Sequence, residues 1–435
     1  MEKNNFRKIA TITLFESAVQ WYCFLLYGTA AGTVFHKVFF SQTGNGTTAL
    51  ILSHMSFAIG YIAGPFGAVF FGHIGDRKGR KVTMYASLLM MGISTSIIGI
   101  LPPAASAGVG VVIVLQLMRL AQCFGRGGTW GGGILMAYEN VPENKRSFYA
   151  AIPQIGLPIG FGLSSILIAV PTLLLPEDIF FTWGWRIPFL AAIILTLIVI
   201  RQKGEMMETE DYKKAQAKLE AEEAEGKKHK VGFIPMVKGY WKTLLLGCGT
   251  RWVDGTFYNI FIVWILSYCI NWLGMPLIQT YIITIIACIF KIPFTLFGGW
   301  CAQKLGNTRT FVIGALASAV LSIPTLKVIE LSKGNLAITI IGIVLGWSIA
   351  YNLIWAVISS LWSSYFETEV RYSGISFVYH VPSFLVAGMV PTICTLLINY
   401  GKGDTIYVGI YSTVVALISA ACALALKARH DRGEK

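Results

Sequence analysis

Charged residues are scarce in this sequence. Only 13% of the 435 residues are charged, whereas 55% are hydrophobic. A soluble domain carries roughly 25% charged residues, and the mean hydropathy of this chain is +0.63. The composition therefore excludes an ordinary soluble protein and predicts a chain that crosses a lipid bilayer several times.

Motifs for metal binding and covalent catalysis are also missing. The eight cysteines lie in or beside apolar runs, and none forms a Cys-x-x-Cys pair or has the spacing of a zinc site. We interpret them as small packing residues. The apolar segments hold neither a metal cluster nor a nucleophile with a matching base, so we expect no cofactor and no enzyme activity. The net charge of +13 lies in the loops, which favours membrane topology over nucleic-acid binding.

Twelve apolar segments, each about as long as a membrane-spanning helix, account for most of the chain. Their ranges are about 12–35, 48–71, 82–101, 109–138, 148–175, 185–201, 241–272, 276–301, 310–330, 336–365, 373–400 and 405–427. The charged, helix-prone stretch 202–240 is interpreted as a cytoplasmic linker. The predicted organisation is one six-helix half over 1–201, the linker, and a second six-helix half over 241–435.

The distribution of lysine and arginine predicts the orientation of the chain in the membrane. They are concentrated at both termini, in the loops expected on the same side, and in the linker; the opposite loops carry only Lys37, Arg186, Lys327, Lys333 and Lys402. Because cytoplasmic loops are enriched in these residues, both termini should lie in the cytoplasm and the chain in the cell (inner) membrane. The first apolar run, of about 24 residues, is too long for a cleaved signal and should remain as the first helix.

A basic, glycine-rich stretch joins the second and third apolar segments. It reads Gly72-His-Ile-Gly-Asp76-Arg77-Lys-Gly79-Arg80-Lys81. We expect a short turn in which the glycines let two helices approach closely while the charges stay in water. This stretch resembles the signature loop of the major facilitator superfamily. The alternative is an ordinary positively charged cytoplasmic loop.

The second half repeats this pattern in a weaker form. The stretch Gly299-Trp-Cys-Ala-Gln303-Lys-Leu-Gly-Asn307 occupies the corresponding position, with Gln303 in place of Asp76 and Asn307 in place of Arg80. A repeat of six helices fits a transporter whose halves rock about a central site. The predicted fold is therefore an all-α membrane protein with twelve transmembrane helices in two pseudo-symmetric six-helix halves, the major facilitator fold.

Further stretches resemble one branch of this superfamily, the metabolite:proton symporter family, whose members move organic acids and zwitterionic osmolytes. They include Gln20-Trp-Tyr-Cys-Phe-x-x-Tyr27-Gly28, Arg119-x-x-Gln122-x-Phe124-x-x-Gly127-Gly-Thr-Trp130, Glu139-Asn-Val-Pro142-x-x-Lys145-Arg146, Pro153-Gln154-x-Gly156-x-Pro158-x-Gly160 and Arg371-Tyr-Ser-Gly374-x-Ser-x-x-Tyr379. The resemblance implies proton symport by alternating access. It also implies a cytoplasmic gate, to which we assign Gly72, Asp76, Arg77, Gly79, Arg80, Arg119, Glu139, Arg146 and Arg371.

The chain departs from this family at three positions that are usually acidic there. Gln20, Cys23 and Thr129 stand where carboxylates would lie in the first and fourth helices. A carboxylate in a membrane cavity is the usual proton carrier, because loss of water can raise its pKa into the working range. Proton coupling would therefore need other groups here, and an uncoupled facilitator stays open as an alternative.

Ionisable residues within the apolar segments are candidates for binding or coupling, because an intramembrane charge is costly unless it is paired or faces water. The candidates are Glu16, Arg126, Asp254, Lys291 and His380. Arg126 and Lys291 favour an anionic solute, whereas Glu16, Asp254 and His380 are the remaining coupling candidates. The structural alternative pairs Glu16 with Arg126 and Asp254 with Arg251.

The family's fold implies a central cavity lined by the first, fourth, seventh and tenth helices. Tyr22, Trp130 and Tyr258 would then be available for substrate contact. Gln20 and Gln154, which belong to the resembling stretches, complete the candidates for binding or coupling. His54 is interpreted as a packed polar residue.

The predicted function is secondary active transport of a small organic solute, a carboxylate or zwitterion, by alternating access with proton symport. The expected partners are that solute, protons and the lipid bilayer, and we expect a monomer. A different class also stays open, a non-transporting membrane sensor on the same fold. The lack of a sizeable soluble domain argues against this class.

Overall fold

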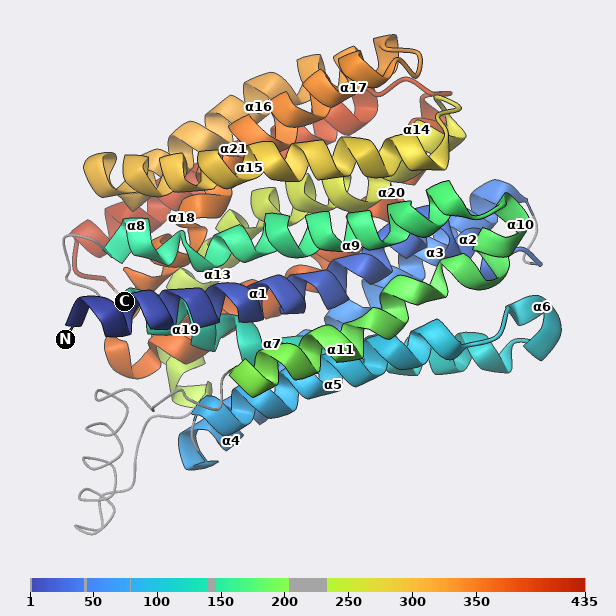
Figure 1. Ribbon diagram of the computed structural model, residues 1–435. Helices are drawn as coiled ribbons and strands as arrows, with labels where there is room; N and C mark the ends of the chain where they lie inside the picture. Colours follow the sequence, from blue (N-terminus) through green and yellow to red (C-terminus); the bar gives the residue numbers. More distant parts are fainter. Residues whose placement is uncertain (1, 43–44, 79, 140–145, 203–232, 435) are drawn as a thin grey trace.

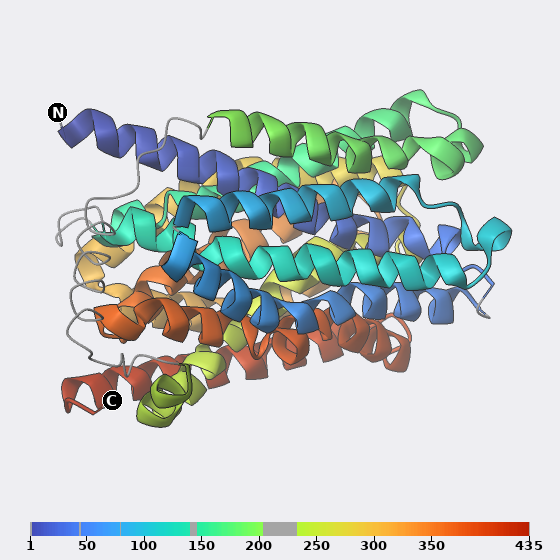
Figure 2. The ribbon, with the colours of Figure 1, turned by 90° about the horizontal axis from the view of Figure 1, so that it is seen from below.

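The computed structural model describes residues 2–42, 45–78, 80–139, 146–202 and 233–434, and the regular structure within these ranges is entirely helical. Long helices run alongside one another, and both ends of the chain lie at the same end of the bundle (Figures 1 and 2). We name this the terminal end. The end that carries α6 (Ala104–Ala107) and α10 (Glu177–Ile179) is the opposite end (Figure 1).

The first half contains six long helical segments within the described ranges. They are α1 (Glu2–Thr33); α3 (Gly46–Ile59), η1 (Gly60–Ile62) and α4 (Ala63–Lys78); α5 (Arg80–Ile100); α7 (Gly110–Glu139); α8 (Arg146–Ala150), η3 (Pro153–Ile155) and α9 (Gly156–Leu174); and α10, η4 (Phe180–Gly184) and α11 (Arg186–Gln202). The short α2 (Phe35–Val38) follows α1.

The second half also contains six long segments within the described ranges. They are α13 (Phe233–Asn259), η6 (Ile260–Trp264) and α14 (Ile265–Asn271); α15 (Leu277–Leu305); α16 (Asn307–Leu331); α17 (Leu336–Ile343), η7 (Val344–Ala350) and α18 (Asn352–Ser363); α19 (Thr368–His380), η8 (Phe384–Gly388) and α20 (Val390–Tyr400); and α21 (Ile406–Asp431). The predicted count of twelve segments is confirmed for the part of the chain that the structure describes.

Length and composition support a membrane location. Among the described residues, nine helical stretches are long and apolar enough to cross a bilayer, and Val390–Tyr400 is a shorter apolar helix. The remaining two segments are α1 and α7, with 32 and 30 residues. Large apolar side chains such as Phe66, Leu173, Val320 and Leu385 are exposed on the bundle surface, where lipid would cover them.

Two predicted boundaries were wrong. The stretch Gly72–Lys81 is not an extended turn, because α4 continues to Lys78 and α5 begins at Arg80. Charged residues are good helix formers, and a helix tolerates single glycines at modest cost, so the helix extends beyond the apolar run. Similarly, α13 begins at Phe233, inside the stretch 202–240 that was predicted as a linker, and non-helical torsions at Tyr240 (φ −118°, ψ 18°) kink it just before the predicted start.

The two halves use the same packing scheme. In the first half α1 packs on α9, α4 on α7 and α5 on α11; the corresponding pairs in the second half are α13 with α19, α15 with α18, and α16 with α21. Such correspondence is what an internal repeat of six helices predicts. Between the halves, α9 packs on α15, α1 on η6 and α14, α3 on α20, and α4 and α7 on α19.

Glycine allows two of these helix pairs to approach closely. A Cβ atom at Gly160 of α9 would lie 2.2 Å from the carbonyl oxygen of Ala18 in α1, and one at Gly127 of α7 would lie 2.5 Å from the carbonyl oxygen of Gly64 in α4. These distances are too short for any side chain. Small residues at helix contacts are typical of membrane bundles, where close backbone approach supplies the packing energy.

Candidate functional site

A bridge between the halves lies at the centre of the bundle. Arg126 of α7 donates a hydrogen bond from its guanidinium to the hydroxyl of Tyr379 in α19. The same guanidinium lies 3.9 Å from the ring centroid of Phe24 and 4.7 Å from that of Trp21, both in α1. Aromatic faces stabilise a buried cation through their quadrupole. Arg126 therefore lies among three helices from two halves, with its charge held away from water.

Arg251 and Asp254 form a buried ion pair within α13, as the structural alternative predicted. Their side chains are 1% and 2% exposed. The other carboxylate oxygen of Asp254 accepts a hydrogen bond from Tyr351, which lies between η7 and α18. The guanidinium of Arg251 lies 4.4 Å from the ring centroid of Tyr379. Tyr379 thus contacts Arg126 from one half and Arg251 from the other.

Lys291 of α15 extends this cluster across the second half. Its Nζ donates to Oδ1 of Asn352 at 2.9 Å and lies 4.4 Å from the ring centroid of Tyr351. Asn352 in turn donates to the carbonyl oxygen of Lys291 at 2.8 Å and accepts from Thr295 at 3.1 Å. All the described partners of the ammonium group are neutral, so its charge is solvated by dipoles and rings rather than by a carboxylate.

Positive charge predominates among the described contacts of this central cluster. It contains three cationic side chains, Arg126, Arg251 and Lys291, and the contacts described above include one carboxylate, Asp254. All four residues are at most 3% exposed. Burying an ion costs several kcal/mol even after relaxation. The described contacts therefore concentrate buried positive charge where α7, α13 and α15 approach the centre.

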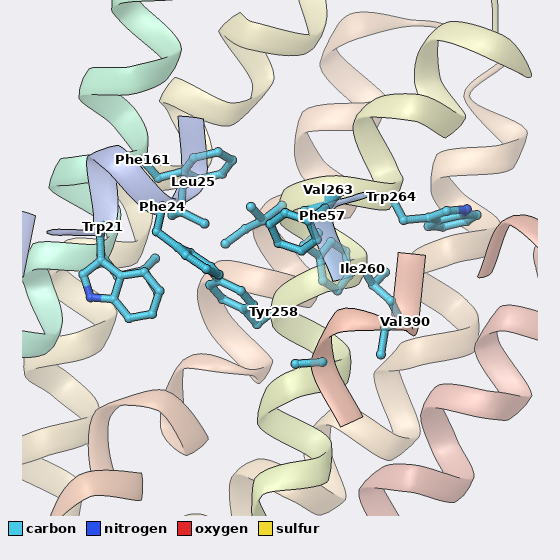
Figure 3. Close-up of a cluster of buried hydrophobic side chains, with 14 of the residues drawn as sticks. Trp21, Phe24, Leu25, Phe57, Phe161, Tyr258, Ile260, Val263, Trp264 and Val390 are labelled. Carbon is cyan, nitrogen blue, oxygen red and sulfur yellow. The ribbon is translucent and has the colours of Figure 1, made fainter. Parts of the chain in front are cut away.

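Aromatic and polar groups beside the cluster could hold the rest of a solute. The Trp21 ring lies 5.6 Å from that of Tyr258 and 5.5 Å from that of Trp355, and Figure 3 shows Trp21 and Phe24 beside Tyr258. Five buried polar atoms in this region have no hydrogen-bond partner in the described structure: Nε2 of Gln20, Nε1 of Trp21, the hydroxyl of Tyr258, Nε1 of Trp347 and Nε2 of His380. Buried polar groups are normally satisfied, so these atoms mark positions where a bound solute or water would form hydrogen bonds.

Irregular helical turns occur next to these residues. In the second half, π-helical turns follow Tyr258, precede Tyr351 and follow His380 closely in the chain, at η6, η7 and η8. In the first half, 3₁₀ turns contain Tyr61 and Gln154. Such turns interrupt the regular backbone pattern and are common at functional sites.

The halves are also in contact on both sides of the cluster. Towards the terminal end, Nε1 of Trp355 donates to the carbonyl oxygen of Gln154 at 3.0 Å, and the amide of Phe148 donates to Gln303 at 3.4 Å. Towards the opposite end, the hydroxyl groups of Thr33 and Tyr281 lie 3.1 Å apart. The two halves therefore touch on both sides of the cluster. This is the arrangement expected for a transporter state that is closed to both sides of the membrane.

Most of the predicted binding or coupling residues with described side chains are brought to this region. Arg126, Asp254 and Lys291 belong to the cluster, and Gln20, Gln154, Tyr258 and His380 are buried around it. His380 packs against α4, since a Cβ atom at Gly64 would lie 2.8 Å from its Nδ1. The side chain of Trp130 lies outside the described residues, although its backbone is part of α7.

Two candidates in α1 lie elsewhere. The hydroxyl of Tyr22 donates to the carbonyl oxygen of Pro188 in α11 at 2.5 Å, within the first half. Because successive helical residues differ by about 100°, Trp21 faces the second half instead. Glu16 is buried, and its charge acts on Tyr85 of α5. The pairing of Glu16 with Arg126 stays a prediction.

Arg119 does not lie with the other gate residues. It is fully buried in the first half, where its guanidinium lies 4.4 Å from the Tyr27 ring centroid and 4.6 Å from that of Phe57. Twenty residues of helix α7 separate it from Glu139, which corresponds to roughly 30 Å. An arginine surrounded by aromatic rings and bound to Gln122 has a packing environment rather than that of a surface latch.

The remaining gate residues lie at the terminal end. Gly72, Asp76 and Arg77 belong to the last turns of α4, Arg80 begins α5 and Glu139 ends α7; their side chains and the whole of Gly79 lie outside the described residues. Arg146 begins α8, which packs on α15 and α18. Nε of Arg371 donates to the carbonyl oxygens of Ser363 and Phe366 at 3.0 and 3.2 Å, and thereby holds the turn between α18 and α19.

Sequence reasoning missed several residues of the cluster. Tyr379, Tyr351 and Asn352 bond directly to the central charges. Trp21 and Trp355, which were not among the candidates, contact each other across the boundary between the halves. Trp21 and Tyr379 lie in the stretches that resemble the symporter family, which was the available signal, whereas no local pattern distinguishes Tyr351, Asn352 and Trp355.

A separate ionic cluster joins two helices at the opposite end. Nζ of Lys327 donates to Oε1 of Glu330 at 3.0 Å and to Oδ1 of Asp404 at 2.7 Å, and Glu330 accepts from the amide of Thr405 at 2.8 Å. The hydrogen bond from Lys327 holds the pKa of Asp404 below its usual range. The cluster connects the end of α16 to the start of α21, and its described hydrogen bonds are all made at this end of the bundle.

Comparisons with known proteins agree with this architecture. Residues 10–391 match the family model of the Major Facilitator Superfamily. An inner membrane metabolite transport protein of Escherichia coli, YhjE, is 33% identical over 98% of this chain and 96% of its own length. The shikimate transporter of the same organism is 31% identical over 97% and 94%. Its proline/betaine transporter is 27% identical over 99% and 85%.

Solved structures show the same fold at lower identity. The xylose transporter XylE of Escherichia coli, in a partially occluded inward-open conformation, superposes with a TM-score of 0.73 at 15% identity, over 97% of each chain. A structure of a D-xylose–proton symporter gives a TM-score of 0.71 at 16% identity, over 96% of each chain. From the family match across most of the chain and from the twelve-helix architecture, we conclude that this multi-pass membrane protein belongs to the major facilitator superfamily.

Proposed function

We propose that this protein is a secondary active transporter for a small organic anion that carries a carboxylate. The observation that carries the proposal is the positive charge of the central cluster, in which Arg126, Arg251 and Lys291 are buried and Asp254 pairs with Arg251. A bound carboxylate would reduce the cost of this buried positive charge and would accept charge-assisted hydrogen bonds.

We assign different parts of the solute to different residues. Arg126 and Lys291 approach the centre from different halves and attract the anion. The hydroxyl of Tyr258 and the indole nitrogens of Trp21 and Trp347 are available to the solute's polar groups. Because these residues come from both halves, a solute held between them would link the two halves, which is the requirement for alternating access. Shikimate, proline and betaine, the solutes in the names of two relatives, each contain a carboxylate.

We further propose that the terminal end is cytoplasmic and that the chain functions as a monomer in the inner membrane. The excess of lysine and arginine at both termini and near the junction of α4 and α5 supports this orientation. Asp76 and Arg80 would form a cytoplasmic latch with Glu139, Arg146 and Arg371. The opposite end then faces the periplasm.

Uptake into proteoliposomes tests the proposal. The panel consists of labelled shikimate, proline and glycine betaine, with and without an inward proton gradient. We expect shikimate, which has no cationic group, to compete best, and to accumulate above its external concentration only with the gradient. Equilibration without accumulation would mean an uncoupled facilitator. A protein that exchanged none of the three, or bound a neutral sugar as tightly, would contradict the proposed carboxylate site.

A further inference from the structure

Lys291 is a fully buried lysine in α15 whose described hydrogen bonds are made to neutral groups. Its Nζ donates to Oδ1 of Asn352 at 2.9 Å and to the carbonyl oxygen of Trp347 at 3.5 Å. The amide of Asn352 is held in this orientation, because its nitrogen donates to the carbonyl oxygen of Lys291 at 2.8 Å. The described surroundings of Nζ therefore contain two hydrogen-bond acceptors.

Two acceptors match a neutral amine better than an ammonium ion. A neutral amine has two N–H groups and a lone pair, whereas an ammonium ion has three N–H groups and no lone pair. The other described neighbours of Nζ are the rings of Tyr351 and Trp347, with centroids 4.4 and 4.7 Å away. Aromatic rings attract a cation, but they carry no negative charge to offset a buried one. An ammonium ion here thus has one N–H left for an anionic acceptor.

The ionisable groups around Lys291 provide no uncommitted carboxylate in the described structure. Those on α15 itself, on the elements that pack on it and just after η7 are Tyr281, Cys288, Cys301, Lys304, Arg146, Tyr149, Tyr268, Cys269, Arg309, Lys327, Glu330 and Tyr351. Glu330 bonds to Lys327 at the opposite end. The groups whose charge acts on Lys291 are Cys288 and, from α13, Asp254. The two oxygens of Asp254 already bond to Arg251 and Tyr351.

Lys291 differs from the two arginines of the cluster in that it can lose its proton. Arginine stays protonated in proteins, whereas a buried lysine exchanges its proton readily. With neither proton nor solute, the amine is neutral and both of its N–H groups are bonded. With both, an ammonium ion faces a carboxylate. An ammonium ion without the solute leaves a buried charge uncompensated, and a carboxylate beside a neutral amine lacks a charged donor.

We propose that Lys291 carries the transported proton, taking it up together with an anionic solute and releasing it when the solute leaves. A proton from water on the open side adds to the lone pair of Nζ, and the solute carboxylate accepts a hydrogen bond from the new N–H. No bond within the solute changes. After the halves rock, the solute dissociates and the ammonium ion returns its proton to water on the other side. By linkage, solute and proton strengthen each other's binding by the same factor. The inference rests on the proposed function, which supplies the anionic solute.

Such a site would couple transport to protons without the missing carboxylates, since Gln20 and Cys23 offer no acid. It would also restrict the class of solute. A carboxylate loses its charge when it binds a proton, whereas lysine gains one. A lysine carrier therefore requires a solute that brings a negative charge to Nζ. We infer that the coupled solutes of this protein are organic anions, and that a neutral solute is not driven by the proton gradient.

Carbon-13 NMR of the full chain in nanodiscs, labelled at lysine Cε, tests the site without any solute. The signal that disappears in Lys291→Met is assigned to Lys291, and its chemical shift reports whether the amine is protonated. We expect a neutral amine in the wild type at pH 7.5. Asn352→Asp places a carboxylate beside Nζ with little change in size, so this variant should hold an ammonium ion. An ammonium ion in the solute-free wild type would overturn the proposal.

Proton uptake during binding tests the linkage. Saturating shikimate is added to purified protein in weakly buffered solution at pH 7.5, and the pH change is recorded. We expect about one proton per bound shikimate in the wild type, and close to none in Lys291→Arg and Asn352→Asp, whose cation at this position is permanent. Lys327→Arg is the matched control, because Lys327 bonds to Glu330 and Asp404 at the opposite end, and it should behave as the wild type. Equal proton uptake in wild type and Asn352→Asp would contradict the assignment.

Transport separates this inference from the proposed function. In proteoliposomes, Lys291→Arg should still exchange labelled for unlabelled shikimate, which needs no proton gradient, but should not accumulate it when an inward proton gradient is applied. Accumulation at the wild-type level would overturn the role of Lys291. If the wild type exchanged none of shikimate, proline and glycine betaine, the proposed function would fail, and the NMR spectrum of the solute-free protein would still decide whether Lys291 gives up its proton.

Discussion

The Tyr379 side chain lies between two arginines from different halves: Arg126 donates a hydrogen bond to its hydroxyl, and the guanidinium of Arg251 lies 4.4 Å from its ring centroid. One neutral residue thus separates two buried cations. Asp254 compensates Arg251, and in the proposed function an anionic solute binds beside Arg126. The following predictions test this arrangement and the packing that positions it.

Arg126→Gln should weaken binding of shikimate, used as the carboxylate probe, by about 10- to 100-fold. A hydrogen bond to a charged group contributes about 1.5–3 kcal/mol, and the variant loses both that bond and the attractive charge. Equilibrium binding to the purified protein measures the change. Tyr379→Phe is the matched control, because it removes only the hydroxyl that Arg126 contacts and should cost less. Unchanged affinity in Arg126→Gln would place the anion elsewhere.

Lys291→Met should stabilise the solute-free protein while removing its response to solute. A buried charge held only by neutral groups can be replaced by an apolar side chain of similar volume without loss of stability, and often with a gain. We expect the melting temperature without solute to stay equal or rise, and the increase that saturating solute produces in wild type to disappear. A large drop in solute-free stability would show that Lys291 has a structural role.

Asp254→Asn should destabilise the protein by about 3–5 kcal/mol, because it leaves Arg251 buried without its partner. The double variant Arg251→Gln with Asp254→Asn should recover most of that loss, since no charge is then left uncompensated. Asp431→Asn is the control: its pair with Lys427 is 56% exposed on the aspartate side, and surface pairs contribute about 0–1 kcal/mol. Thermal unfolding in detergent compares the four proteins.

Gly160→Ala should disrupt the contact between α1 and α9. The new Cβ would lie 2.2 Å from the carbonyl oxygen of Ala18, and overpacking of this kind costs about 1–3 kcal/mol. Gly110→Ala at the start of α7 is the matched control, because a Cβ there meets no atom within 4 Å. A melting temperature equal to that of the control would mean that α1 and α9 can move apart without cost.

Asp76→Asn should impair transport without preventing membrane insertion. The proposed latch at the terminal end needs the carboxylate of Asp76 near cations such as Arg80, and asparagine keeps the size of the side chain but not its charge. Uptake and membrane abundance are measured in the same preparation. Normal uptake at normal abundance would contradict the latch.

Composition and the length of the apolar runs were enough to predict the class of protein, an all-helical membrane protein, and most of the helix boundaries. Runs of about 20 apolar residues must become helices in a bilayer, because every backbone polar group then bonds within its own segment. This requirement is local, so it can be read from the order of residues. Placing helix ends from the apolar runs alone failed at Gly72–Lys78 and at Phe233–Gly239, because the helices there continue into polar sequence.

The candidate ionisable residues could also be found from the sequence, because a charged residue within an apolar run stands out from its neighbours. Arg126, Asp254 and Lys291 were identified in this way, and all three belong to one cluster. Their partners could not be identified by this reasoning. Tyr379 is 253 residues from Arg126 along the chain, and Tyr351 is 97 residues from Asp254.

Only the packing of the helices establishes which residues meet. The side of α1 that faces the second half carries Trp21, while Tyr22 bonds within the first half, and this choice depends on the rotation of a helix against its neighbours. The bond pattern of His54 likewise depends on two hydroxyls from other helices. Local sequence specifies a helix because its hydrogen bonds are internal, whereas the partners of a site's charged and polar groups come from contacts between helices that are distant in the chain.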